Sequence, residues 1–229
     1  MVGPPCVTVG VSATELAVAY PRLYHMAEAD AWPSIRVHGL RSTTALLDLY
    51  GYRGAARTAI EDARRPAMVE LRGDGLPVAQ VRDNLPMTDA DLVRCLRDGL
   101  TPSEWYSLLN QRVFFWVSEK RLETLLGARA YRKRDHDILI LDTASVLASH
   151  AAQTSLSPMN SGNTKPFAHP RGRDTFLPLA QYPFWLRKAR GLEPLVELAV
   201  DYALADVEAH VLRVDRRSAG QAPRVLWQR

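Results

Sequence analysis

The sequence predicts an α+β fold, in which apolar strands form the core and helices flank them. Two runs, residues 112–117 (RVFFWV) and 138–142 (ILILD), are apolar without alternation. Such runs are typical of strands buried on both faces. Helix-start and helix-stop signals surround these runs, which indicates helices packed around a sheet.

The first 20 residues are expected to be an N-terminal arm followed by a helix. Residues 1–11 predict a loose arm. Ser12 and Glu15 have the three-residue spacing of a capping box, and Pro21 ends the helix that they begin. A short apolar strand is expected over residues 23–26, and it contains His25 as its polar residue.

The region after this strand predicts a series of short helices and one hairpin. A helix over residues 28–37 would end at Gly39 in the left-handed conformation, and Ser42 would cap a helix over 45–50. Residues 68–71 and 78–81 predict a hairpin. Further helices are expected over residues 57–64 and 89–96 and from 101 onward. Two more are expected over 119–127, capped by Ser118, and over 143–150, capped by Thr143.

Residues 154–190 predict a long irregular loop, and loops of this length are usually functional or disordered. Basic and aromatic residues are mixed along it against a single acid, Asp174, which suits single-stranded nucleic acid. The alternative is that the aromatic residues only anchor the loop to the core. The sequence then predicts strands over 195–200 and 211–214, with a short helix over 205–209 between them. A flexible tail is expected over 216–229, apart from an apolar segment that could dock.

The composition limits the class of protein. The 229 residues carry a formal net charge of +4 and a pI of about 9.2, which permits a nucleic-acid partner without requiring one. Cys6 and Cys95 form no disulfide framework, which fits a reducing cytoplasm. We expect no membrane span and no secretory signal. Phosphate-loop, dinucleotide, GxSxG and zinc-binding spacings are not found, so no metal is expected.

Glu197 and His25 are the polar residues on otherwise apolar strands. A carboxylate in such a strand is costly to bury unless it is paired or used. Glu197 is therefore either an acid at the edge of a cleft or a residue paired with a surface arginine. His25 is either a core residue or part of the same site. The rings of residues 114–116 either fill the core or face a ligand.

These residues resemble a known family. Residues 24–26, 32–40, 112–117 and 196–214 are similar to the opening strand, the first helix, the aromatic strand and the glutamate segment of the ADP-ribosyltransferase fold, and distantly of the DarT group of DNA ADP-ribosyltransferases. The resemblance implies one domain over residues 21–215 with a split mixed or antiparallel β core. It also implies an insertion over 70–110 and a basic substrate loop over 154–190.

The resemblance implies an enzyme that transfers ADP-ribose from NAD to a base in DNA. It implies catalytic roles for Glu197, His25 and Arg65. It implies NAD contacts from Tyr24, His25, Ser42, Phe114, Phe115 and Trp116. It implies substrate contacts from Arg82, Asn160, Ser161, Gly162, Asn163, Lys165, Arg171 and Arg173.

The implied partner is single-stranded or flipped-out DNA, and an antitoxin-like protein is a further possibility. Two alternatives stay open at this point. One is an N-glycosylase on the same fold that removes a base from DNA or RNA without NAD. The other is a nucleic-acid-binding module without activity.

Overall fold

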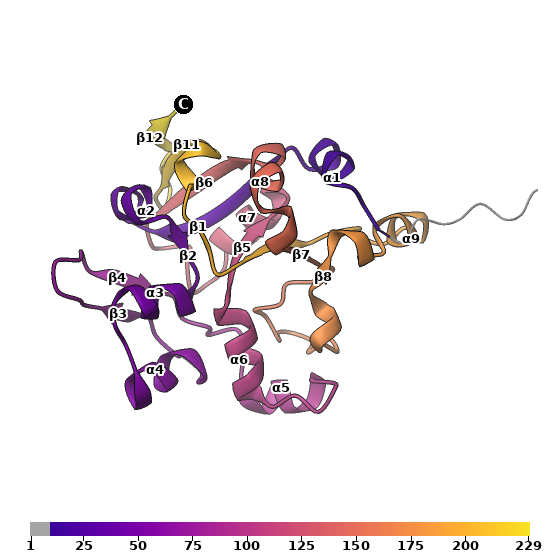
Figure 1. The fold of residues 1–229 in the computed structure, drawn as a ribbon, viewed down its shortest axis with the longest axis horizontal. Helices are drawn as coiled ribbons and strands as arrows, with labels where there is room; N and C mark the ends of the chain where they lie inside the picture. Colours follow the sequence, from indigo (N-terminus) through magenta and orange to yellow (C-terminus); the bar gives the residue numbers. More distant parts are fainter. Residues whose placement is uncertain (1–9) are drawn as a thin grey trace, which may run out of the picture.

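A computed structural model describes residues 10–229, and its core is an eight-stranded sheet in the order β12-β11-β6-β1-β5-β9-β7-β8 (Figure 1). Neighbouring strands are antiparallel throughout this sheet. In chain order the strands are β1 (Arg22–Glu28), β5 (Arg112–Trp116), β6 (His136–Asp142), β7 (Thr154–Ser157), β8 (Leu177–Pro178), β9 (Glu197–Asp201), β11 (Val211–Arg217) and β12 (Arg224–Gln228). The predicted α+β class is confirmed, with an antiparallel core.

The sheet is interrupted between β1 and β5. Strand β1 pairs with β6 along its whole length, from Arg22 to Glu28. Between β1 and β5, in contrast, Tyr24 and Trp116 are the only register pair. The two central strands therefore diverge beyond this pair, and their backbone groups do not continue the ladder there.

Helices cover both faces of the sheet. The main apolar cluster joins one face to α1 (Ala13–Ala19), α2 (Trp32–His38) and α8 (Thr143–His150). Helix α7 (Glu119–Leu126) lies over β1 and β5 and buries Leu122 against Tyr24 and Met26.

The remaining elements gather beside the diverging strands (Figure 1). They are α3 (Thr43–Leu49), α4 (Gly54–Glu61), the β3–β4 hairpin (Val69–Leu71 and Ala79–Val81), α5 (Asp89–Cys95) and α6 (Pro102–Asn110). Short segments complete the chain: β2 (Leu40–Arg41), η1 (Ala151–Gln153), η2 (Arg173–Thr175), η3 (Leu179–Gln181), α9 (Phe184–Ala189), β10 (Ala203–Leu204) and η4 (Val207–Ala209).

Several local predictions are confirmed. Ser12 with Glu15 forms the predicted capping box. The helix expected from residue 101 onward is α6, and Thr101 with Glu104 forms a further capping box at its start. The Ser42 side chain accepts from the Ala45 N–H and caps α3. The hairpin pairs β3 with β4 as expected.

The helix predicted over residues 28–37 is wrong at its start, because α2 begins only at Trp32. Glu28 instead ends β1, where it pairs with His136 across the ladder and binds Arg134. Gly39 has φ 80° and ψ 163°, so it is not in the predicted left-handed helical conformation. A Cβ there would lie 2.7 Å from the Ala205 backbone, so the close approach of β10 requires glycine.

The N-cap of α8 is Asp142 and not Thr143, because the Asp142 carboxylate accepts from the Ser145 N–H at 2.6 Å. Ser118 stands at the predicted N-cap of α7 without a side-chain hydrogen bond to the helix.

The loop predicted over residues 154–190 is also wrong as a description of the whole segment. Residues 154–157 form the buried strand β7, which pairs with β9, and residues 184–189 form α9. The tail is not flexible throughout, since β12 pairs with β11. The predicted arm over residues 1–11 lies mostly outside the described residues, but Val11 is buried and its N–H donates to the Leu179 carbonyl.

Within residues 10–229, no helix has the length and apolar character needed to cross a bilayer.

Candidate functional site

A cavity of about 1110 Å³ lies where β1 and β5 diverge. Its walls come from β1, from the segment that joins α2 to α3, from the β3–β4 hairpin, from β5 and α7, and from residues 160–163. His25 and Glu197 both line it. A cavity of this size accommodates a ligand as large as a dinucleotide.

Glu197 begins β9 and is 4% exposed. The backbone N–H and the hydroxyl of Ser161 both donate to its Oε2, at 3.1 and 2.7 Å. Burial raises the pKa of Glu197 to about 7, against the two Ser161 hydrogen bonds and the charges of Arg171 and Arg121, which lower it. The carboxyl group can therefore give or take a proton near neutral pH.

His25 is half-buried, and its Nδ1–H donates to the Phe114 carbonyl at 2.9 Å. This bond joins β1 to β5 where the backbone ladder has ended. Burial, with Arg82 nearby, lowers the pKa of His25 to about 4 although the Phe114 bond raises it. The ring is therefore neutral at physiological pH, and its Nε2 is left to accept a hydrogen bond from a ligand hydroxyl.

His25 and Glu197 belong to different faces of the sheet. The two-residue period of β1 puts His25 on the face of Leu23, whereas Glu197 lies on the face of Ala199. Both side chains nevertheless line the one cavity. They therefore approach a bound ligand from two sides of the opening between β1 and β5.

The segment Asn160–Asn163 lies on the cavity wall, as the sequence predicts. Arg171 holds it there from behind, by donating from its guanidinium to the Ser161 and Asn163 carbonyls at 2.9 Å each. Arg171 has no exposed surface, so its predicted contact with substrate is wrong. It positions Ser161, and through Ser161 it positions the Glu197 carboxylate.

Arg65 also serves the fold. Its guanidinium donates to the carbonyls of Ile60 and Arg82 and to the Asn110 side chain, and it is 8% exposed. Burial lowers the pKa of Arg65 to about 10. Although Arg65 borders the cavity, each nitrogen of its guanidinium donates to the protein, and the predicted catalytic role has no geometry to support it.

Arg82 lines the cavity and keeps its predicted place at the end of the hairpin. Its side chain pairs with Glu28 at 3.3 Å and lies over the Tyr131 ring, 4.8 Å from the centroid.

The predicted ring wall is only partly present. Phe115 borders the cavity too, but it is 1% exposed and its ring packs into the main apolar cluster, so it offers a ligand little surface. Phe114 and Trp116 are half-buried and border the cavity. Tyr24 packs under α7, and the Ser42 hydroxyl caps α3, so the side chains of both serve the fold although both residues border the cavity.

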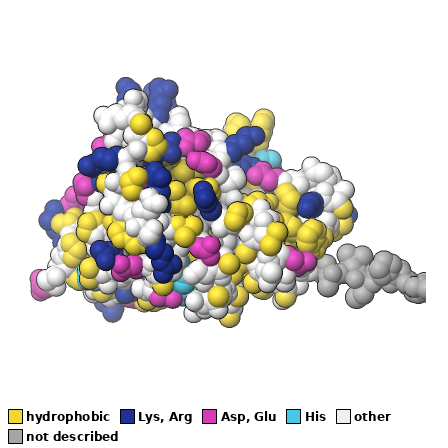
Figure 2. All heavy atoms as spheres, turned by 90° about the horizontal axis from the view of Figure 1, so that it is seen from above, with side chains coloured by type: hydrophobic (Ala, Val, Ile, Leu, Met, Phe, Trp, Pro, Cys, Tyr) yellow, Lys and Arg dark blue, Asp and Glu magenta, His cyan; other side chains and the backbone are white. Residues whose placement is uncertain are grey.

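Lys165 and Arg173 are exposed and do not line the cavity. Lys165 binds Asp91, and Arg173 lies 3.9 Å from Glu104. Basic and acidic side chains are also mixed on the face of the molecule that Figure 2 shows, where Lys and Arg lie among acidic and apolar side chains. The basic character of the 154–190 segment is therefore partly neutralised by neighbouring acids.

Arg41 and Arg121 border the cavity, and the sequence-based site does not include them. Arg41 on β2 borders the cavity; its Nε donates to the His38 carbonyl at 2.7 Å, and within residues 10–229 no carboxylate forms an ion pair with it. Arg121 on α7 pairs with Glu193 near Glu197. Arginine is abundant in this chain, so the sequence alone does not distinguish these two; only the Gly39-Leu40-Arg41-Ser42 context points to the first.

The fold and the cavity define a class of protein: an antiparallel α+β domain with a buried acid and a neutral histidine on one large cavity. The chain belongs to DUF7002, a family of unknown function whose model matches residues 21–211. The match includes His25, Glu197 and the cavity wall between them. No curated protein and no solved structure matches the chain.

Proposed function

We propose that this protein is an enzyme of the ADP-ribosyltransferase type, which transfers ADP-ribose from NAD to a base of single-stranded or flipped-out DNA. The observation that carries the proposal is that His25 and Glu197 line one cavity beside the opening between β1 and β5. The resemblance to the DarT group requires a split between the central strands, with a histidine and a glutamate beside it. A buried carboxyl group with a pKa of about 7, aimed into a cavity, is typical of a catalytic acid or base.

In this proposal NAD is a substrate, and the cavity groups hold its parts. The neutral His25 accepts a ribose hydroxyl at Nε2, since Nδ1 is occupied by the Phe114 carbonyl. Arg41 contributes a charge for the diphosphate. Phe114 and Trp116 offer ring surface to the nicotinamide.

The transfer breaks the bond between C1′ of the ribose and the nicotinamide nitrogen, and the bonding electrons leave with the neutral nicotinamide. Positive charge develops on the ribose, and the ionised Glu197 stabilises it electrostatically. A nitrogen of the acceptor base then forms the new bond to C1′ and loses a proton, which Glu197 accepts. The pKa of about 7 suits a group that takes this proton near neutral pH.

Binding and turnover of NAD test the first half of the proposal. We expect NAD to bind the full chain and nicotinamide to be released when single-stranded DNA is added. Glu197→Gln should bind NAD but release no nicotinamide. Glu123→Gln is the matched control, since Glu123 is exposed, pairs with Arg217 and does not line the cavity. Failure of NAD to bind a folded wild-type protein would overturn the proposal.

A second candidate rests on the same carboxyl group. With a pKa of about 7, Glu197 is partly protonated at neutral pH and could donate its proton to a departing base. The protein would then be an N-glycosylase that acts without NAD. Loss of a base from the oligonucleotide in the absence of NAD would select this function and exclude the first.

A further inference from the structure

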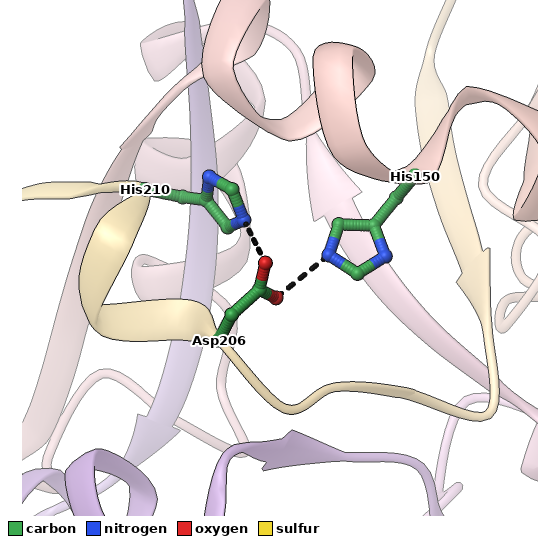
Figure 3. A group of neighbouring side chains, drawn as sticks. All are labelled: His150, Asp206 and His210. Atoms are coloured by element: carbon green, nitrogen blue, oxygen red, sulfur yellow. Dashed lines mark hydrogen bonds and ion pairs between the residues drawn. The ribbon is translucent and has the colours of Figure 1, made fainter.

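His150, Asp206 and His210 form a cluster that none of the steps above uses (Figure 3). His150 ends α8, Asp206 lies between β10 and η4, and His210 lies between η4 and β11. The Asp206 carboxylate sits between the two rings, with Oδ1 2.7 Å from His150 Nε2 and Oδ2 3.0 Å from His210 Nε2. One ligand atom of each residue lies within 4.8 Å of the others.

The outer nitrogen of each ring is fixed by a neighbouring side chain. His150 Nδ1 lies 3.0 Å from Gln153 Oε1, and because an amide oxygen only accepts, Nδ1 carries the proton. His210 Nδ1 lies 2.7 Å from Ser145 Oγ, whose own hydrogen points to the Ala209 carbonyl at 3.4 Å. In the tautomer that carries its proton on Nδ1, the hydroxyl oxygen accepts from His210 Nδ1–H.

This arrangement leaves lone pairs on both Nε2 atoms, and both face the carboxylate of Asp206. Two hydrogen-bond acceptors at 2.7 or 3.0 Å repel each other unless a proton or a metal ion lies between them. At His150 the 2.7 Å contact has the geometry of a hydrogen bond, so a proton on Nε2 satisfies it as well as a metal ion does. His210 makes the case most clearly, because the residue is 2% exposed and its Nε2 is buried without a hydrogen-bond partner. The short contact to Asp206 therefore lacks the alignment of a hydrogen bond.

We propose that His150, Asp206 and His210 bind a divalent transition-metal ion of the zinc type. Two imidazole nitrogens and one carboxylate oxygen are ligands that Zn²⁺ takes in proteins, whereas Mg²⁺ and Ca²⁺ prefer oxygen. The hydrogen bonds from Nδ1 to Ser145 and Gln153 orient the rings as the outer partners of metal-bound histidines do. Asp206 is about half exposed, so water can reach a fourth position.

The site lies apart from the cavity, because none of its three residues lines it. It joins the end of α8 to the segment between β10 and β11. Strand β10 pairs with β2, on which Arg41 lies, so a metal ion would also brace one edge of the cavity. We therefore expect metal binding to raise the unfolding temperature of the protein.

The test uses the tag-free full chain, stripped with a chelator and dialysed against Zn²⁺. We expect one Zn²⁺ per chain, and an increase in Tm that the chelator reverses. Asp206→Asn and His150→Gln should each weaken Zn²⁺ binding at least tenfold, because each removes a charged or nitrogen ligand. His169→Gln is the control for adventitious binding, since His169 is exposed and outside the cluster. Excess Mg²⁺ should not displace Zn²⁺.

A measurement on the unaltered chain keeps the proposal testable if a variant fails to fold. Of the six histidines, two should shift their ring resonances when one equivalent of Zn²⁺ is added. Co²⁺ in place of Zn²⁺ should give visible absorption typical of nitrogen and oxygen ligands. The proposal is overturned if Zn²⁺ binding does not saturate near one equivalent, if other histidines shift, or if the folded variants bind Zn²⁺ as tightly as the wild type.

Discussion

Ser161 donates both its backbone N–H and its hydroxyl to one oxygen of Glu197, at 3.1 and 2.7 Å. This pairing links the Asn160–Asn163 segment to the first residue of β9. Hydrogen bonds to a carboxylate favour its ionised form, so Ser161 holds the pKa of Glu197 below the value that burial alone would produce.

Ser161→Ala should therefore raise the pKa of Glu197 further. A hydrogen bond to a charged group contributes about 1.5–3 kcal/mol, which corresponds to roughly one to two pH units. The acidic limb of the pH–rate profile for nicotinamide release should move to higher pH by that amount. Ser155→Ala is the matched control, because the Ser155 hydroxyl is buried without a hydrogen-bond partner. An unchanged profile in Ser161→Ala would show that Glu197 is not the group that titrates.

Glu197→Gln should change how stability depends on pH. The pKa of Glu197 is raised from 4.5 to about 7 on folding, so the folded state binds more protons than the unfolded state between these values. The free energy of unfolding of the wild type therefore falls as pH rises through this window. Glu197→Gln lacks this loss. As pH rises from 4.5 to 8, the free energy of unfolding of the variant should therefore increase by about 3 kcal/mol relative to that of the wild type.

Urea unfolding at the two pH values measures this difference. Glu123→Gln should follow the wild type, since Glu123 is exposed. If Glu197→Gln and the wild type lose stability in parallel, the carboxyl group is not buried in the way described.

Arg171→Met should strongly lower the free energy of unfolding, because the substitution leaves the carbonyls of Ser161, Asn163 and His169 without their donor. We expect a loss of about 3–5 kcal/mol. Arg173→Met should stay within about 0.5 kcal/mol, because the Arg173 side chain is exposed and its guanidinium lies 3.9 Å from the Glu104 carboxylate. Its backbone N–H keeps its bond to Asp98 in the variant. Denaturant midpoints compare the two, and equal midpoints would contradict the positioning role of Arg171.

Arg41→Met should weaken NAD binding with little effect on the rate at saturation. Loss of one charged contact to a diphosphate predicts roughly a tenfold rise in KM. Arg36→Met is the control, because Arg36 is exposed and pairs with Glu208 away from the cavity. A drop in kcat with unchanged KM would argue against a phosphate contact.

The parts of the fold that follow from local chemistry could be predicted from the sequence. The capping boxes at Ser12 and Thr101 each need only a hydroxyl and a glutamate three residues later. The apolar run of β5 and the turn of the β3–β4 hairpin are equally local signals.

The errors arise where tertiary contacts decide. Strand β7 reads as loop because Thr154 and Ser155 are polar, yet pairing with β9 buries them. Glu28 looks helical, but its partners His136 and Arg134 keep it in β1.

The candidate site was predictable in part. His25, Glu197 and Asn160–Asn163 line one cavity, as expected from two polar residues on apolar strands. The resemblance implies a catalytic role for Arg65, and the basic 154–190 segment implies a substrate contact for Arg171. Both side chains are instead buried among carbonyl groups, which the sequence does not reveal because charged residues are mostly exposed. The cluster of His150 and His210 was missed because its ligands come from segments far apart in the chain, which no spacing motif detects.

The most direct test of the central claim is mass spectrometry of a short single-stranded DNA incubated with the protein and NAD, with NAD omitted in a parallel reaction. We predict an increase in oligonucleotide mass by one ADP-ribose group, which requires NAD and is lost in Glu197→Gln but retained in Glu123→Gln. Unmodified DNA in the presence of folded protein and NAD would contradict the account.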